Sequence, residues 1–185
     1  LVFWGSNNPT SINKQLAHYA AAQLQKQITA TIIDLNDFPL PLYNIETEIK
    51  FGIPVKAKEL KELISQYDGY VIAVAEHNGS ITAFFKNVLD WVSRVDKSYG
   101  IFHEKPVVLL GTSPGPGGAK GALQHAEAII KRLAGKVIAS VSLPLFFGNF
   151  KGSEDTYEIL DANRKKMIQH ALDKLAISAA SPVLM

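Results

Sequence analysis

The sequence contains no cysteine among its 185 residues. Disulfides, thiolate zinc sites, thiolate-held iron–sulfur clusters and cysteine nucleophiles are therefore excluded. An excess of charge of one sign is also missing, because 19 basic and 17 acidic residues leave a formal net charge of +2. This balance argues against a nucleic-acid partner. No apolar run approaches the ~18 residues that a membrane span needs, so we expect no membrane partner either.

Length and composition point to one globular domain. The chain is shorter than those that usually split into domains, and 47% of its residues are hydrophobic. Charged residues make up 19%, below the typical ~25%, which excludes a disordered or fibrous chain. The sequence opens on a strand-like LVFW segment with no signal peptide and lacks cysteine, so we expect a cytoplasmic protein.

Apolar residues alternate along the chain between strand-like runs and helical spacing. We expect strands over residues 1–4, 29–35, 68–75, 105–112 and 137–143. We expect helices over 12–24, 55–66, 81–95, 119–133 and 154–175, a long loop over 36–54 and a tail over 176–185. This alternation predicts a single α/β domain over residues 1–185, with helices on both faces of a parallel sheet. Five strands fit a flavodoxin-like, doubly wound sheet of order 2-1-3-4-5.

In such a sheet, ligands bind beyond the carboxyl ends of the strands, so the loops after the first, third and fourth strands are the candidate site. The first loop, GSNNPTSIN, contains the candidate binding residues Ser6, Asn8, Ser11, Ile12 and Asn13. Its polar residues surround the start of a helix, where free N–H groups and the helix dipole favour an anion. The loop matches neither a P-loop nor a Rossmann fingerprint. A polar cap on an ordinary helix would explain the same residues.

The second loop follows the most apolar strand and contains the candidates Ala75, Glu76, His77 and Asn78. Acidic, imidazole and amide groups at a strand end can act in acid–base chemistry or form a platform for a flat ring. A simply solvated histidine is the alternative explanation of His77.

The third loop is rich in glycine and proline and contains the candidates Ser113, Pro114, Gly115 and Gly117. Glycine lets the backbone come close to a ligand, because no side chain intervenes. A tight turn between a strand and a helix would need the same residues without any ligand.

Together these segments resemble the NADPH-dependent FMN reductase family, which includes quinone, azo and chromate reductases. The family's G-S-x-R-x-x-S-x-N loop is matched at Gly5, Ser6, Ser11 and Asn13. Its P-E-Y-N-x-S segment corresponds to AEHNGS at 75–80, and its L-K-N-A-x-D-W-x-S-R helix to FKNVLDWVSR at 85–94. A P-x-Y-N loop at 41–44 and an S-P-G…G-G-A-basic segment at 113–120 also match, so the resemblance covers nearly the whole chain.

The resemblance implies bound FMN, with NADPH or NADH as the electron donor. Ser6, Ser11 and Asn13, with backbone N–H groups of residues 8–13, would hold the phosphate. Residues 76–78 would line the isoalloxazine ring largely through the main chain, and Ser113 and Gly115 would close its other edge. Hydride would pass from NAD(P)H through FMN to a flavin, quinone or similar small acceptor in a ping-pong cycle. The chemistry is the cofactor's, so no side chain need be catalytic, and His77 is the one candidate modulator.

Three positions depart from the family pattern. Asn8 stands where the family has arginine, and Ala75 and His77 stand for its proline and tyrosine. These changes remove a cation and a flat aromatic neighbour, so we expect FMN to bind more loosely than in close relatives. They also leave open an alternative, a non-catalytic FMN-binding or regulatory protein. A flavodoxin-type electron carrier would normally be acidic, which this chain is not.

Two further expectations concern chemistry and assembly. Four candidates for hydrolytic or metal chemistry lie in different segments without triad-like or metal-ligand spacing, so we expect neither a hydrolase nor a metal site; these are Asp34, Asp37, His103 and His125. On helix 81–95, Trp91 widens the apolar stripe beyond what one sheet face covers. A homodimer or homotetramer through this helix would bury the excess, and the alternative is that loop 36–54 of the same chain covers it.

Overall fold

The computed structural model describes residues 1–96, 98–153 and 156–180. At its centre is a four-stranded parallel sheet whose inner strands are buried on both faces. In spatial order its strands are β1 (Val2–Trp4), β2 (Tyr70–Val74), β5 (Pro106–Thr112) and β6 (Lys136–Leu143). The predicted α/β fold with a parallel sheet is confirmed.

The expected strand over residues 29–35 is reduced to a single parallel bridge between Val2 and Ile32. The N–H of Val2 donates to the Thr31 carbonyl at 2.8 Å, and the N–H of Ile33 donates to the Val2 carbonyl at 3.0 Å. The segment therefore lies beside β1 without extending the pairing. Just after the bridge, the chain turns into the short 3-10 helix η1 (Leu35–Asp37), which the side chain of Asp34 caps. The predicted five-strand order is therefore not confirmed, because the parallel sheet has four strands.

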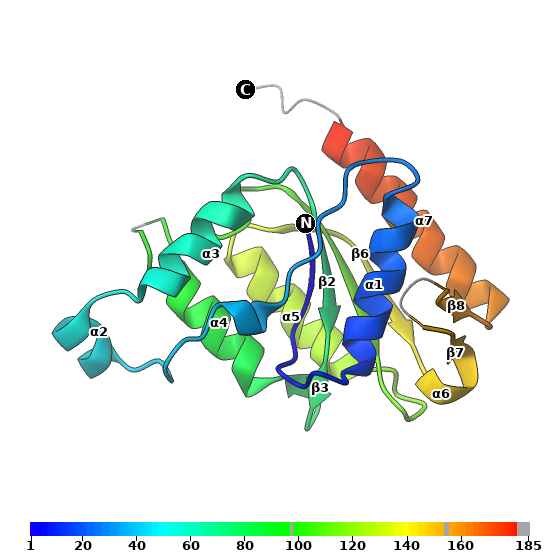
Figure 1. The fold of residues 1–185 in the computed structure, drawn as a ribbon, viewed down its shortest axis with the longest axis horizontal. Coiled ribbons are helices and arrows are strands. Elements are labelled where there is room, and N and C mark those ends of the chain that lie inside the picture. Colours follow the sequence, from blue (N-terminus) through cyan, green and yellow to red (C-terminus); the bar gives the residue numbers. More distant parts are fainter. Residues whose placement is uncertain (97, 154–155, 181–185) are drawn as a thin grey trace.

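Helices cover both faces of the sheet (Figure 1). On one face lie α1 (Ile12–Leu24) and α7 (Ala162–Ala180), which pack with Trp4, Val71 and Val108. On the other lie α3 (Val55–Ser65), α4 (Ala83–Ser93) and α5 (Lys120–Arg132), which pack with Phe3, Ile72 and Leu109. Neighbouring residues of a strand thus enter opposite cores, as period-two alternation requires. Within the described ranges, no helix is long and apolar enough to cross a bilayer.

The last third of the chain differs from the sequence prediction at both ends of its helix. α7 begins at Ala162 because the Asp161 carboxylate accepts the N–H groups of Asn163 and Arg164 at 2.9 and 3.0 Å. Before it come the one-turn helix α6 (Phe146–Asn149) and a hairpin of β7 (Phe150–Lys151) and β8 (Glu158–Ile159). Residues 176–180 continue α7, so the tail prediction was wrong there. Glu154 and Asp155, where the helix was expected to begin, and residues 181–185 lie outside the described residues.

The segment over 36–54 is not a plain loop. It contains α2 (Ile45–Phe51), capped by the Asn44 side chain, and α2 projects from the body of the molecule (Figure 1). We call residues 41–55 the arm.

Side chains of α4 and of its C-cap residue, Arg94, hold this arm by hydrogen bonds and an ion pair. Trp91 Nε1 donates to the Pro41 carbonyl at 2.7 Å, and Asn87 Nδ2 donates to the same oxygen at 3.0 Å. Arg94 forms a two-pronged pair with Glu48, with contacts of 3.0 Å. Trp91 is fully buried, so the arm of the same chain covers the apolar excess that had suggested an oligomer.

Candidate functional site

The end of β1 is packed tightly onto the start of α4. Gly5 donates its N–H to the Ala73 carbonyl at 2.9 Å and accepts the Thr82 hydroxyl at 2.7 Å. A Cβ at Gly5 would lie 2.8 Å from the ring of Phe85, so only glycine fits without displacing that ring. Thr82 was missed in the sequence, although a threonine just before an apolar helical stripe is a typical N-cap. Its hydroxyl accepts the Phe85 N–H at 3.0 Å.

The first loop gathers hydrogen-bond donors at the start of α1. The Ser6 hydroxyl oxygen accepts the Asn8 N–H, and that of Ser11 accepts the Asn13 N–H, each at 3.2 Å. Both serines are buried. Since each oxygen is already accepting from the backbone, each hydroxyl keeps its hydrogen to donate elsewhere. The N–H of Ile12 opens the helix and has no acceptor within it. This donor set suits an anion.

Asn8 is used to shape the loop. Its side-chain oxygen accepts both the N–H and the hydroxyl of Thr10, each at 2.9 Å, and the residue is exposed. Its carbonyl accepts the Ser11 N–H at 3.1 Å. The position therefore supplies a local turn where the family pattern has a cation.

Asn13 joins the first loop to the third across the sheet. Its amide nitrogen donates to the Thr112 carbonyl at 3.1 Å, and its amide oxygen accepts the Thr112 N–H at 3.0 Å. The residue is buried, with 3% exposed. Thr112 in turn donates its hydroxyl to the Leu143 carbonyl at 2.6 Å. The side chain of Asn13 is thus a brace between loops.

The second loop forms a two-residue β-hairpin, which the sequence analysis missed. Strands β3 (Glu76–His77) and β4 (Ser80–Ile81) pair antiparallel. Asn78 and Gly79 connect them with φ values of 52° and 77°. Positive φ at both central positions is what Asn-Gly favours in a hairpin turn, so this dipeptide was the available signal. Ala75 is buried before the hairpin, and His77 and Asn78 are exposed on it.

Two side chains of the hairpin turn toward α5. Glu76 accepts the backbone N–H of Ala122 on its Oε2 atom at 3.0 Å. The Ser80 hydroxyl lies 2.6 Å from Nδ1 of His125. Among the second-loop candidates, Glu76 therefore directs its carboxylate into the protein.

The third loop borders open space on one side and is braced on the other. A Cβ at Gly115 or Gly117 would meet no atom within 4 Å. The carbonyls of Ser113 and Gly115 accept the N–H groups of Phe146 and Leu145, at 3.1 and 3.0 Å. Pro114 lies between these two anchored residues. The glycines therefore border open space at the same edge of the sheet as the donors of the first loop.

Comparison with known proteins identifies the family of the chain. The family model described as NADPH-dependent FMN reductase matches residues 1–149. The chain belongs to this family. Membership confirms the expected enzyme class, with FMN as cofactor and NAD(P)H as donor, and favours it over the non-catalytic alternative.

Similar FMN reductase relatives are named for quinone reduction. The chain is 30% identical to a 2-hydroxy-1,4-benzoquinone reductase of Burkholderia sp over 176 residues, which cover 93% of this chain and 91% of that one. It is 28% identical to a quinone reductase of Escherichia coli (strain K12) over 158 residues, or 82% and 81% of the two chains.

Solved structures share the fold of this FMN reductase. The flavoenzyme NAD(P)H:(acceptor) oxidoreductase FerB from Paracoccus denitrificans superposes with a TM-score of 0.76 at 21% identity, covering 96% of this chain and 94% of that one. The apo form of the NADH:FMN oxidoreductase EMOB superposes with a TM-score of 0.63 at 17% identity, covering 97% and 89%.

The residues present fit the cofactor of this family. Buried serine hydroxyls at a helix start are suited to a phosphate, and the open space beside Gly115 and Gly117 would let the backbone approach a flat ring.

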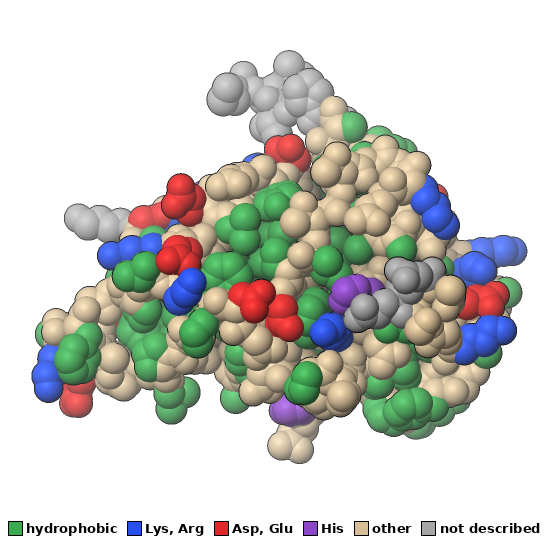
Figure 2. All heavy atoms as spheres, viewed as in Figure 1, with side chains coloured by type: hydrophobic (Ala, Val, Ile, Leu, Met, Phe, Trp, Pro, Cys, Tyr) green, Lys and Arg blue, Asp and Glu red, His purple; other side chains and the backbone are tan. Residues whose placement is uncertain are grey.

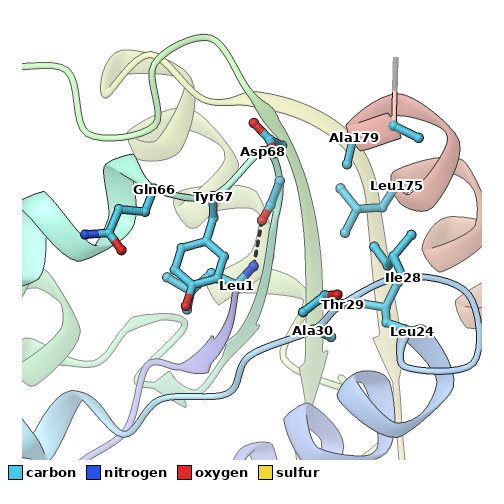
Figure 3. Close-up of a pocket in the computed structure, with 12 residues that line it drawn as sticks. Leu1, Leu24, Ile28, Thr29, Ala30, Gln66, Tyr67, Asp68, Leu175 and Ala179 are labelled. Carbon is cyan, nitrogen blue, oxygen red and sulfur yellow. Dashed lines mark hydrogen bonds between the residues drawn. The ribbon is translucent and has the colours of Figure 1, made fainter. Parts of the chain in front are cut away.

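The protein also has a cavity that is lined by none of the candidate site residues. A cavity of about 370 Å³ lies at the opposite, amino edge of the sheet (Figure 3). Its walls include Leu24, Ile28, Tyr67 and Leu175, and Leu1 donates its N–H to the Gly69 carbonyl beside it at 2.9 Å. It therefore lies apart from the candidate site.

Proposed function

We propose that this chain reduces a quinone, a flavin or a similar small flat acceptor with electrons from NAD(P)H, using FMN held at the carboxyl edge of the sheet. One observation carries the proposal: the Ser6 and Ser11 donors, the 76–81 hairpin and the open glycine loop meet at that edge. The names of the quinone-reducing relatives support the acceptor class. The sheet topology supports the place, because ligands of doubly wound sheets bind at this edge.

The first loop would hold the phosphate. Ser6 and Ser11 would donate their hydroxyl hydrogens, and the N–H of Ile12 would add a backbone donor at the positive end of α1. Asn8 and Asn13 would act by shaping and bracing the loop, through Thr10 and Thr112.

The hairpin and the glycine loop would hold the ring between them. The main chain of residues 76–78 would face one edge, and the segment from Ser113 through Pro114 and Gly115 to Gly117 the other. FMN so bound would take a hydride from NAD(P)H and pass two electrons to the acceptor. The protein would orient donor and acceptor in turn in the same opening, which makes the cycle ping-pong. His77, exposed on the hairpin, would be the one modulator of the ring among the side chains.

The test is the visible absorption spectrum of the purified protein before and after FMN, then NADPH, then benzoquinone. We expect protein-bound flavin bands that bleach with NADPH and recover with the quinone. Bands that never bleach would favour a non-catalytic FMN-binding or regulatory protein. Loss of all flavin on gel filtration, even after excess FMN, would overturn the proposal.

We also propose that the protein is a homodimer or homotetramer, in which the arm that covers α4, and not helix 81–95 itself, would be the contact surface. Exposed apolar side chains gather on the arm, and Figure 2 shows apolar side chains over α2 on this face. Ile49 and Phe51 are 80% and 73% exposed. The ties to Asn87, Trp91 and Arg94 hold this surface in place, and exposed apolar patches of this kind mark association sites.

Light scattering after gel filtration tests the assembly. The double variant Ile49→Glu/Phe51→Glu is expected to be monomeric. Phe147→Glu is the matched control, because Phe147 is 74% exposed on α6, away from the arm. A wild-type monomer would contradict the proposed assembly and leave the proposed reaction unaffected.

Because the proposed reaction uses NAD(P)H, we propose that the protein acts in the cytoplasm, where metabolism regenerates the dinucleotide.

A further inference from the structure

Helix α5 has no cap from its own segment. Its N-cap residue, Ala119, has a φ of 61° and offers no side-chain hydrogen bond. The cap comes from Glu76, whose Oε2 atom accepts the N–H of Ala122 at 3.0 Å. These two residues are 46 positions apart in the sequence. A carboxylate at this end of a helix satisfies a free donor and faces the positive end of the dipole.

The hairpin also contacts α5 closely at Gly79 and Ser80. A Cβ at Gly121 would lie 2.7 Å from the Gly79 carbonyl oxygen and 3.3 Å from Oε2 of Glu76. The turn of the hairpin therefore rests on a helix position that only glycine leaves free. On β4, the contact between Ser80 and His125 at 2.6 Å ties the second strand to the same helix.

We propose that Glu76 is a positioning residue: by capping α5, its carboxylate fixes the hairpin whose main chain faces the flavin ring. This rests on the proposed function, because it assumes FMN at the hairpin. The side chain acts through α5 and does not need to touch the ring. Without the carboxylate, the hairpin keeps its turn but loses the hydrogen bond that sets its distance from the helix.

FMN affinity measured by quenching of FMN fluorescence tests this role with two substitutions at one position. Glu76→Ala is expected to raise the Kd about tenfold, the scale of one lost helix cap. Glu76→Gln keeps an oxygen that accepts the Ala122 N–H, so its Kd should stay within about threefold of wild type. Glu127→Ala is the control, because Glu127 lies on the exposed side of α5 and pairs with Lys131.

Gly121→Ala tests the position of the hairpin without removing the charge of Glu76. It keeps the Glu76 carboxylate, but its Cβ would push the Gly79 carbonyl away from the helix and crowd Oε2 of Glu76, so it should weaken FMN binding as Glu76→Ala does. Amide hydrogen exchange of the FMN-free protein adds a readout that needs no cofactor. Glu76→Ala should speed exchange at residues 76–81 and at the start of α5, while Glu127→Ala and Glu76→Gln should not.

The outcomes separate this role from the proposed function. Wild-type FMN affinity in Glu76→Ala, or unchanged exchange in the hairpin, would overturn the positioning role alone. Equal weakening by Glu76→Gln and Glu76→Ala would also overturn it, because the capping oxygen that glutamine keeps would then not account for the effect. Failure of the wild-type protein to bind FMN would overturn the proposed function, and the exchange measurement would still show whether Glu76 holds the hairpin.

Discussion

The two edges of the sheet differ in what they offer a ligand. The amino edge has a cavity of about 370 Å³, and the Tyr70 hydroxyl at this edge is already in use, because it donates toward the carbonyls of Ile64 and Tyr67, at 2.9 and 3.2 Å. The carboxyl edge is built from loops, and Ser6 and Ser11 keep hydrogens to donate there. Empty volume alone does not make a binding site, since recognition needs polar groups whose partners are absent from the protein itself.

The strongest way to break this contrast is a matched pair of glycine substitutions. Gly5→Ala would place a Cβ 2.8 Å from the Phe85 ring, whereas Gly69→Ala would place one 2.9 Å from a methyl group of Leu175. A buried ring cannot move aside, but a leucine methyl beside a cavity can. We expect Gly5→Ala to lower the free energy of unfolding by about 3 kcal/mol and to weaken FMN binding more than tenfold. Gly69→Ala should cost about 1 kcal/mol or less.

Urea unfolding and FMN titration of both variants measure these effects. Unchanged FMN affinity in Gly5→Ala would contradict the placement of the site. Weakened FMN binding in Gly69→Ala would show that the amino edge is not separate from it.

A second pair removes a buried polar group at each edge. Asn13→Ala leaves the Thr112 N–H and carbonyl without their partner, so we expect a loss of about 2 kcal/mol in unfolding free energy and weaker FMN binding. Tyr70→Phe removes hydrogen bonds at the amino edge and should cost about 1 kcal/mol with FMN affinity unchanged. Calorimetric titration with FMN, done beside thermal unfolding, distinguishes the two. The comparison fails if both variants, or neither, lose FMN affinity.

His77→Tyr should sharpen the carboxyl edge. Replacing the exposed imidazole on the hairpin with a tyrosine restores the flat aromatic neighbour of the family pattern, and one such ring contact is worth ~0.5–1.5 kcal/mol. The FMN Kd should therefore fall by a factor of about 2 to 10. A Kd equal to that of wild type would remove His77 as a cause of looser binding.

The smallest expected effect lies far from the loops and depends on pH. The Lys61 ammonium, 2.6 Å from Asp96, together with the Ser98 hydroxyl lowers the pKa of the Asp96 carboxyl to about 2. A lowered pKa stabilises the fold above the ordinary aspartate pKa of ~3.9, and this contribution is lost as the pH falls through the folded value. Asp96 is half exposed, so Asp96→Asn should cost only about 0.5 kcal/mol at neutral pH.

Urea unfolding at several pH values checks this last expectation. The difference between wild type and Asp96→Asn should shrink between pH ~4 and pH ~2. FMN affinity at neutral pH should be equal in the two proteins. A difference that grows on acidification would contradict the sign.

The sequence predicted the sheet and the edge that carries the polar loops, because both follow from local patterns. Buried strands such as Tyr70–Val74 are continuous apolar runs, and helix starts such as Ser11 carry a capping side chain. Topology then assigns the loops to one edge.

What the sequence did not reveal depends on contacts between distant segments. The 29–35 run has β-branched residues, but only Ile32 forms a bridge to β1, and from Asp34 the chain turns into η1. Trp91 looked like surplus apolar surface, because nothing local indicates that the Pro41 carbonyl accepts its N–H. The cap of Ala122 by Glu76 joins residues 46 positions apart. The Asn78-Gly79 dipeptide does indicate a hairpin turn, but the sequence prediction did not include one.

The hydrogen bonds between Asn13 and Thr112 join residues 99 positions apart. During synthesis they can form only after both segments have left the ribosome. The first loop leaves the ribosome early, yet its brace exists only after Thr112 has emerged and β5 has docked. A nascent chain that stops short of this point carries the serines without the geometry that holds them. Cofactor loading is therefore expected to follow the docking of β5, so that a bound flavin marks a chain whose sheet is already assembled.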